Sequence, residues 1–292
     1  MSDATLPLVS IAMPVRDSQA TLVLALRSIV GQTFENWELL LIDDGSTDGT
    51  PTIARQFASE DRRIRVYSDG QQLGLPERLN QAIAASRGAY FARMDGDDIA
   101  YPRRLERQME YLEQHPDVDL VGAGATVFHG NGTVLGKRLG PEHHGDICAH
   151  PYLHICVMHP NFLGHIRFFR TYGYRSSAHR CEDQDLLLRG NRCARYANVQ
   201  EILLGYREEQ LKLRRILQAR YYMAQSYFYV FLQRRQPFFA LGAVVTQAFR
   251  GMVDAIAISS GLNYRLLRHR ALPVSESERN QWQHVWSELT GS

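Results

Sequence analysis

The most informative part of the sequence is the stretch Ala92-Arg93-Met94-Asp95-Gly96-Asp97-Asp98-Ile99-Ala100-Tyr101-Pro102-Arg103. It follows an apolar run at residues 89–92 that is typical of a buried strand, and it leads into a helix predicted over residues 103–114. Carboxylates crowded at a strand end repel one another unless a cation compensates their charge. Such oxygen ligands suit Mg²⁺ or Mn²⁺, which substrate phosphates commonly complete. The stretch predicts a metal site for a phosphorylated substrate; a solvated turn with capping aspartates is the alternative.

A second acidic strand end lies upstream. The apolar run at residues 38–42 stops at Asp43-Asp44-Gly45-Ser46-Thr47-Asp48-Gly49-Thr50, and an earlier apolar run at residues 8–13 stops at Pro14. Helix-like segments separate these runs, and this alternation predicts a parallel α/β sheet whose ligands bind at the carboxyl ends of the strands. We therefore expect three strand ends to line one crevice: residues 14–17, Asp43-Asp44 and residues 95–98.

Glycine-rich phosphate loops are absent from the sequence. The first strand-to-helix turn is Met13-Pro14-Val15-Arg16-Asp17-Ser18, which contains no glycine, and no G-x-x-x-x-G-K-[ST] segment occurs. A dinucleotide fold needs the glycines that let its backbone approach a pyrophosphate. We therefore expect a metal held by Asp95 and Asp97 to meet the phosphate charge.

Five segments of the chain resemble family 2 glycosyltransferases of the GT-A fold, of the bacterial surface-polysaccharide type. They keep the family's order over roughly residues 8–207. The segments are Val9-Ser10-Ile11-Ala12-Met13-Pro14-Val15, residues 28–38, residues 42–50, Met94-Asp95-Gly96-Asp97-Asp98, and Cys181-Glu182-Asp183-Gln184-Asp185-Leu186-Leu187-Leu188-Arg189.

The resemblance implies an α/β fold, with a Rossmann-like mixed and mainly parallel sheet flanked by helices. It implies a catalytic domain over residues 1–207. Its nucleotide-sugar half would span about 8–125 and its acceptor half about 126–207. Residues 208–292 would form a helical appendage.

The resemblance also implies a donor site. Its residues would be Pro14, Val15, Arg16, Asp43, Asp44, Asp95 and Gly96. Asp44, with Asp43 beside it, matches the position that accepts a hydrogen bond from the base, and a carboxylate suits the ring N–H of uracil. Asp97 is expected to bind Mg²⁺ or Mn²⁺ directly, with Asp95 as a second ligand nearer the sugar. Asp98 would either support the ligands or cap the following helix. Arg16 stands where many relatives carry an aromatic residue.

On the acceptor side, Asp183 matches the catalytic base of an inverting transfer, which takes the proton of the attacking hydroxyl. Glu182 would position the acceptor or simply begin the following helix. His159, in the segment His159-Pro160-Asn161, would lie near the acceptor. The Q-x-x-R-W signature of processive relatives is absent from residues 208–215, so we expect one sugar to be added per encounter.

Residues 143–159 are rich in histidine and cysteine, which suggests zinc, but the usual C-x₂-C spacing is missing. Acceptor contacts or ordinary packing are the alternatives. The four cysteines show no disulfide-scaffold spacing, and residues 1–7 show no secretory signal. We therefore expect a cytoplasmic protein with reduced thiols.

The C-terminal third is basic and aromatic. Residues 203–272 hold eleven Lys or Arg and three acids, a balance of +8 in a chain whose total is +2. Gln247, Arg250 and Asp254 share one helix face within an otherwise apolar segment, which indicates an amphipathic helix. We expect these helices to lie on an anionic membrane surface; packing on the catalytic domain or dimerisation is the alternative. No recognition motif supports nucleic-acid binding. Trp282 and Trp286 are a predicted docking face.

The expected function is metal-dependent, inverting, non-processive transfer of a sugar from a nucleotide donor, with UDP as the expected nucleotide. The acceptor would be a hydroxyl of a glycan, and the resemblance implies a lipid-linked glycan at the inner face of the cytoplasmic membrane. Two alternatives stay open: a nucleotidyltransferase, and a catalytically silent module that binds a sugar nucleotide or a membrane.

Overall fold

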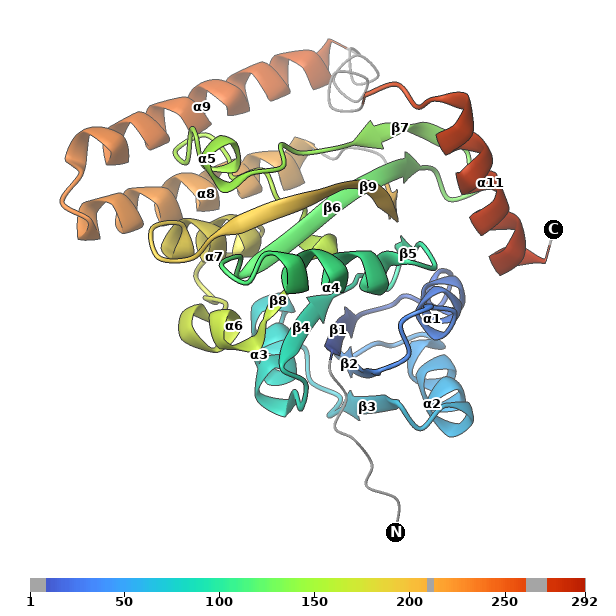
Figure 1. Ribbon diagram of the computed structural model, residues 1–292. Helices are drawn as coiled ribbons and strands as arrows, with labels where there is room; N and C mark the ends of the chain where they lie inside the picture. Colours follow the sequence, from blue (N-terminus) through green and yellow to red (C-terminus); the bar gives the residue numbers. More distant parts are fainter. Residues whose placement is uncertain (1–8, 209–212, 261–271, 292) are drawn as a thin grey trace.

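The computed structural model describes residues 9–208, 213–260 and 272–291. Within these residues the strands form one nine-stranded mixed sheet (Figure 1). Its first part alternates strands and helices in this order: β1 (Val9–Val15), α1 (Leu22–Val30), β2 (Trp37–Asp43), α2 (Thr50–Glu60), β3 (Ile64–Ser68), α3 (Leu75–Ala85) and β4 (Tyr90–Arg93). The four strands pair in parallel in the order β3-β2-β1-β4. This confirms the parallel α/β pattern.

The rest of the sheet mixes both directions. Its elements are β5 (Ile99–Ala100), α4 (Arg104–Gln114), β6 (Leu120–Phe128), β7 (Val134–Arg138), α5 (His144–Ile147), η1 (His159–Asn161), β8 (Leu163–His165), α6 (Ile166–Tyr172), α7 (Glu182–Gly190) and β9 (Tyr196–Arg207). β8 runs antiparallel to both β4 and β6, and β9 pairs in parallel with β6 and antiparallel with β5. The sheet therefore continues from the parallel strands β1–β4 into the mixed second half without a break.

Burial on both faces explains why the strands read as unbroken apolar runs. Every residue of β2 is buried. Leu39 and Leu41 pack toward α1, α2 and α4, whereas Leu40 and Ile42 pack toward α3, α6 and α7. Each buried leucine contributes roughly 1.5–3 kcal/mol, so alternating residues of one strand stabilise two cores.

The helix predicted over residues 103–114 begins one residue later, at Arg104. α1 begins at Leu22, after a turn in which the Ser18 carbonyl accepts hydrogen bonds from the N–H groups of Thr21 and Leu22. Asp17, just before it, has a φ of 46°, a left-handed conformation that aspartate tolerates better than most residues.

The C-terminal part contains three described helices: α8 (Leu213–Gln233), α9 (Pro237–Ser259) and α11 (Glu276–Thr290). α8 and α9 form a helical hairpin. α8 packs on α7, and α9 lies at the outer edge of the molecule (Figure 1). By length and composition alone, α9 is the described helix that could cross a membrane. In an 18-residue window of this helix the mean hydropathy is 1.4, and 22% of the window is buried. Residues 209–212, part of the segment compared with processive relatives, lie outside the described residues.

The two tryptophans of α11 dock on the sheet of their own chain. Trp282 is 1% exposed, packs against Phe128 with ring centroids 4.6 Å apart, and donates a 2.7 Å hydrogen bond from Nε1 to the Gly132 carbonyl. Trp286 packs on the same phenylalanine. The helix begins with a capping box between Ser275 and Glu278. The expected docking face is thus an internal contact.

Candidate active site

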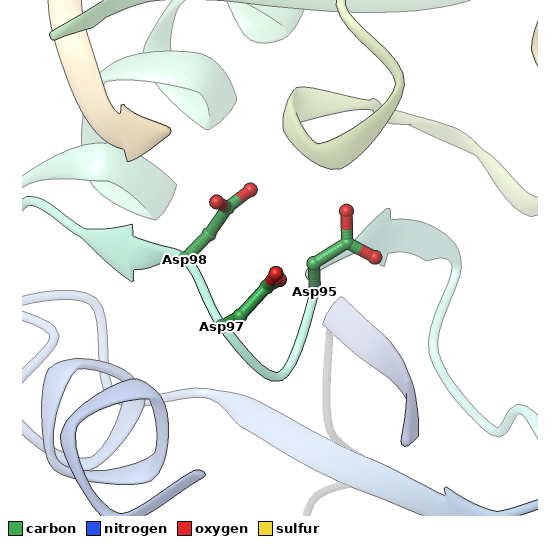
Figure 2. Close-up of side chains that lie close together, drawn as sticks. All are labelled: Asp95, Asp97 and Asp98. Carbon is green, nitrogen blue, oxygen red and sulfur yellow. The ribbon is translucent and has the colours of Figure 1, made fainter. Parts of the chain in front are cut away.

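Asp95, Asp97 and Asp98 come together in the loop between β4 and β5. One oxygen from each of the three carboxylates lies within 4.8 Å of the others. Figure 2 shows the three side chains projecting from the same side of the loop. Asp95 and Asp97 keep contact with solvent, whereas Asp98 is 1% exposed. Among the described residues, this is the group of acidic, histidine and cysteine side chains that could hold a metal ion.

The protein environment disfavours negative charge on two of these carboxylates. Burial, followed by the charge of Asp95, raises the pKa of Asp97 to about 6. Burial also raises the pKa of Asp98 well above its ordinary value, with further contributions from Asp95 and Asp97. Three acids thus share a site with less compensation than their charges need, and a divalent cation would relieve this repulsion.

The donor set fits Mg²⁺ or Mn²⁺. Oδ2 of Asp98 is buried and has no hydrogen-bond partner among the described residues, and an unsatisfied buried carboxylate oxygen is unfavourable unless something binds it. The other oxygen, Oδ1, accepts a 2.8 Å hydrogen bond from the Arg207 backbone N–H. Carboxylate oxygens alone, without nitrogen or sulfur, are typical ligands of these hard cations.

Asp98 is not a helix cap. α4 begins after Arg103, whose side chain makes no capping hydrogen bond, and the Asp98 carboxylate instead contacts β9. Arg207 also donates from Nε to the carbonyl of Asp97 at 2.8 Å. The end of β9 therefore holds the acidic loop in place, a contact for which the sequence carries no recognisable signal.

Gly96 fits the loop because it lacks a side chain. A Cβ atom at this position would lie 2.7 Å from Cγ1 of Val15, which is too close for any side chain. The carbonyl of Gly96 accepts a 2.9 Å hydrogen bond from the Thr21 hydroxyl. The acidic loop is therefore seated directly against the end of β1, where the predicted donor residues Pro14, Val15 and Arg16 lie.

Asp44 sits at the end of β2 and is tied to the loop before α3. Its N–H donates to the Val15 carbonyl at 2.9 Å. Its Oδ1 accepts from the N–H groups of Leu73 and Gly74 and from Nε of Arg78, at 2.7, 3.0 and 2.9 Å. Its Oδ2 accepts one longer bond, 3.1 Å from Gly74. A carboxylate offers about four acceptor sites, so Oδ2 retains capacity for a further donor.

Asp43 and Arg16, two further members of the predicted donor set, differ in their surroundings. Asp43 is buried and organises the turn, because its carboxylate accepts from the Ser46 N–H at 3.0 Å and the Ser68 hydroxyl at 2.8 Å. Arg16 is exposed and lies 3.6 Å from a carboxylate oxygen of Asp17. Asp43 is thus a buried residue that organises the turn after β2, whereas Arg16 is exposed beside Asp17.

Asp183 lines a cavity of about 670 Å³ between the sheet and the α8–α9 hairpin. It stands in the first turn of α7, and one of its oxygens accepts a 3.2 Å hydrogen bond from the Gln184 side chain. Gln184 is itself fixed by Ile155 and by the Tyr227 hydroxyl of α8. The candidate base therefore faces open space from a firmly held helix end.

The two candidate acceptor residues differ in their surroundings. His159 lines the cavity, and its Nε2 lies 3.0 Å from the Tyr174 hydroxyl. Burial, with a contribution from Arg93, holds the pKa of His159 well below its ordinary value, so the imidazole is neutral at pH 7. Glu182 is buried and accepts a 2.9 Å bond from the Arg180 N–H, and burial raises the pKa of its carboxyl.

Arg93 is a buried partner of the acidic loop that sequence reasoning missed. The side chain is 4% exposed and forms an ion pair with Asp95. Burial alone would lower the pKa of Arg93, but the charges around it, including those of Asp95, Asp98 and Asp183, raise it. The charges of the acidic loop and of the candidate base thus both act on Arg93. The sequence feature that could have indicated its role is an arginine at the last position of a strand that is otherwise apolar.

The histidine- and cysteine-rich segment does not form a zinc site. All of residues 143–159 are described, and no three of their side chains converge as metal ligands. Cys148 contacts His144 at 3.9 Å, and His144 Nδ1 accepts from the Tyr196 backbone N–H. Cys148 and His144 thus pack against their neighbours, whereas His154, Cys156 and His159 line the cavity that contains Asp183.

The fold is that of the GT-A glycosyltransferases. S. aureus TarS (residues 1–349, in complex with UDP-GlcNAc) superimposes with a TM-score of 0.63 at 14% identity, covering 97% of this chain and 80% of that one. Mannosyltransferase PcManGT from Pyrobaculum calidifontis, in complex with GDP-Man and Mn²⁺, gives 0.60 at 13% identity, covering 98% and 88%.

Sequence comparison gives the family. The model of glycosyl transferase family 2 matches residues 10–173. The putative glycosyltransferase EpsE of Bacillus subtilis is 39% identical over 211 residues, 70% of this chain and 74% of EpsE. The O-antigen biosynthesis glycosyltransferase WbnJ of Escherichia coli is 30% identical over 243 residues, 80% of this chain and 93% of WbnJ. The chain belongs to glycosyl transferase family 2.

Proposed function

We propose that the protein is an inverting, metal-dependent glycosyltransferase that uses a nucleotide sugar, with UDP as the nucleotide. The observation that carries the proposal is the pairing of an undercompensated acid cluster with a separate carboxylate, Asp183, in a cavity. One group of acids suits a cation on the leaving diphosphate, and the other suits proton removal.

The donor would span two strand ends. Asp97, with Asp95 and Asp98, would hold Mg²⁺ or Mn²⁺, which when bound neutralises charge on the diphosphate. Asp44 would accept the base N–H through Oδ2, and Pro14, Val15, Arg16, Asp43 and Gly96 would form the wall between these points. The UDP-GlcNAc complex of TarS and the GDP-Man and Mn²⁺ complex of PcManGT support a nucleotide sugar for this fold.

Transfer requires a base on the face opposite the leaving group. In the proposed reaction Asp183 accepts the proton of the acceptor hydroxyl while the oxygen attacks the anomeric carbon and the bond to the diphosphate breaks. His159, neutral and held by Tyr174, would contact the acceptor by hydrogen bonding, and Glu182 would support the base from the start of α7. Inversion follows from attack opposite the leaving group.

The acceptor side is proposed from the relatives and from the layout of the chain. WbnJ is named for O-antigen biosynthesis, which favours a glycan acceptor, and we propose a lipid-linked one on the inner face of the cytoplasmic membrane with a single sugar added per encounter. Residues 1–207 would form the catalytic domain, with donor half 8–125 and acceptor half 126–207, and residues 208–292 would form the helical region that meets the membrane.

Thermal unfolding with nucleotides tests the donor site. We expect UDP to raise the melting temperature only when Mn²⁺ or Mg²⁺ is present, because a ligand that binds the native state stabilises it by about 2.7 kcal/mol at a hundredfold excess over Kd. Asp97→Asn should remove this shift, whereas Asp146→Asn, an equal change at an exposed aspartate of α5, should keep it. Stabilisation by a nucleoside triphosphate but not UDP would favour a nucleotidyltransferase, and no response to any nucleotide would favour a silent module.

A further inference from the structure

Helix α9 turns its polar side chains toward the protein. Gln247 is fully buried and Asp254 is 4% exposed, and both contact Arg220 of α8, with Asp254 accepting two hydrogen bonds of 2.9 and 3.1 Å. Arg250 donates to the Leu153 carbonyl at 3.1 Å. The face that the sequence marks as the water-facing side of an amphipathic helix is therefore an internal contact.

The opposite face of α9 exposes a continuous row of large apolar side chains. Its six members are between 53% and 89% exposed: Phe238, Leu241, Val245, Phe249, Met252 and Ile256. Their spacings of three and four residues place them along one side of the helix. Scattered surface leucines are ordinary, but a contiguous apolar row along a whole helix marks an interaction surface. We call these six residues the α9 stripe.

The hairpin that carries the α9 stripe presents only positive charge to solvent. Residues 213–259 contain six arginines and one acid, and that acid is the buried Asp254. The exposed charged side chains are Arg214 and Arg215 at the start of α8 and Arg235 at the turn into α9. Arg235 is followed closely by Phe238 and Phe239, so cations and aromatic rings stand together at that end.

We propose that the α9 stripe lies flat in the headgroup boundary of an anionic lipid bilayer, with the exposed arginines against the lipid phosphates. Apolar burial combined with flanking cations is the binding mode of interfacial helices. A second copy of this chain fits less well, because two like-charged hairpins would face each other. A spanning orientation fits less well too, because it would strip Asp254 and Gln247 from their partners on α8.

This surface places the candidate active site at the membrane. The inward side of the same hairpin lines the cavity that contains Asp183, through Arg220 and Met223 of α8 and Arg250 of α9. The inference rests on the proposed function in one respect: a lipid-anchored acceptor could reach Asp183 while its chain stays in the bilayer. The docking surface itself stands on the exposed row and its charges.

Vesicle flotation of the full chain tests the surface. We expect binding to vesicles of phosphatidylcholine with phosphatidylglycerol, weaker binding to phosphatidylcholine alone, and loss of bound protein at high salt or in Arg214→Gln/Arg215→Gln. Phe249→Glu should lower partitioning by about tenfold or more, since one buried phenylalanine contributes that much. Gln114→Glu adds the same charge at an exposed site on α4 and should bind as the unmodified protein does.

Several outcomes would overturn the proposal. One is vesicle binding by Phe249→Glu equal to that of the unmodified protein. Another is retention on membranes after alkaline carbonate extraction, which indicates a spanning helix. The third is a concentration-dependent dimer that Phe249→Glu dissociates, with no vesicle binding by either the unmodified protein or the variant. The UDP and Mn²⁺ melting shift is measured on the same samples and also reports that Phe249→Glu is folded. Vesicle binding without a nucleotide shift would refute the proposed function alone, and a shift without vesicle binding would refute the surface alone.

Discussion

Nε of Arg78 donates a 2.9 Å hydrogen bond to Oδ1 of Asp44, and both side chains are buried. The same guanidinium pairs with Asp69 at 2.7 Å and reaches the Gln71 carbonyl. One arginine on α3 thus fixes the carboxylate at the end of β2 and the loop that precedes α3. The predicted base-binding residue is preorganised by a cation far from it in sequence.

Replacing Arg78 with glutamine should destabilise the protein and weaken nucleotide binding. Removing one partner of a buried ion pair leaves the other uncompensated, and we expect the free energy of unfolding to fall by about 3 kcal/mol. Urea unfolding measures this, and the UDP-induced melting shift measures the site. Arg62→Gln, the same change at an exposed arginine, should alter stability by less than about 0.5 kcal/mol. Equal effects in the two variants would contradict a structural role for the buried pair.

Replacing Asp183 with asparagine should abolish transfer and leave donor binding intact. A general base contributes roughly a hundredfold to ten-thousandfold in rate, and the side chain lies apart from the acid cluster. The measurement is release of the nucleoside diphosphate in the presence of bacterial lipid extract, together with the metal-dependent melting shift. Asp146→Asn serves as the matched control. Transfer by Asp183→Asn at the unmodified rate would exclude this residue as the base.

His159 should lower the free energy of unfolding as the pH drops below about 6.5, against the opposite contribution of Asp97, Asp98 and Glu182, whose pKa values are raised in the folded protein. Its pKa is held well below the ordinary value in the folded protein, whereas in the unfolded chain it is about 6.5. The unfolded state therefore binds the extra proton first, and the free energy of unfolding decreases by up to about 1.4 kcal/mol per pH unit below 6.5. Urea unfolding at pH 7 and pH 5 should show a smaller drop for His159→Asn than for His143→Asn, an exposed control. The same drop in both variants would rule out His159 as the source.

Replacing Trp282 with alanine should detach α11 from the sheet. Truncating a fully buried tryptophan costs about 3–5 kcal/mol, and here the indole also fills the space beside Gly205. Chemical denaturation gives the loss in stability, and limited proteolysis shows whether the helix is released. The partly exposed Trp286 offers the comparison: Trp286→Ala should be milder, and the reverse order would mean that the anchor is misidentified.

Patterns within single segments predicted the first half of the fold well. The apolar runs of β1 and β2 are buried on both faces, so each run alone indicated a central parallel strand. The acidic cluster was also visible, because Asp95, Asp97 and Asp98 are near neighbours in the chain. To place these segments in one site, it was enough that the strand ends meet at one edge of the sheet, and a parallel sheet has this arrangement.

Contacts between distant segments could not be read in the same way. Arg207 holds Asp97 and Asp98 through the end of β9, and Arg78 holds Asp44 from α3. Neither arginine differs in sequence context from an exposed one. The orientation of α9 was missed for a related reason: periodicity shows that Gln247 and Asp254 share a face, but only the position of Arg220 decides that this face turns inward.

Val15 separates the two ends of the proposed nucleotide site. Its carbonyl holds the backbone of Asp44, and its side chain abuts Gly96 in the acidic loop. One valine therefore helps to set the distance between the carboxylates of Asp44 and Asp97, without itself having to contact the base or the metal. A change in side-chain size at position 15 would alter which donors span that gap while the acids stay the same, a route by which relatives with identical acids could diverge in the nucleotide they accept.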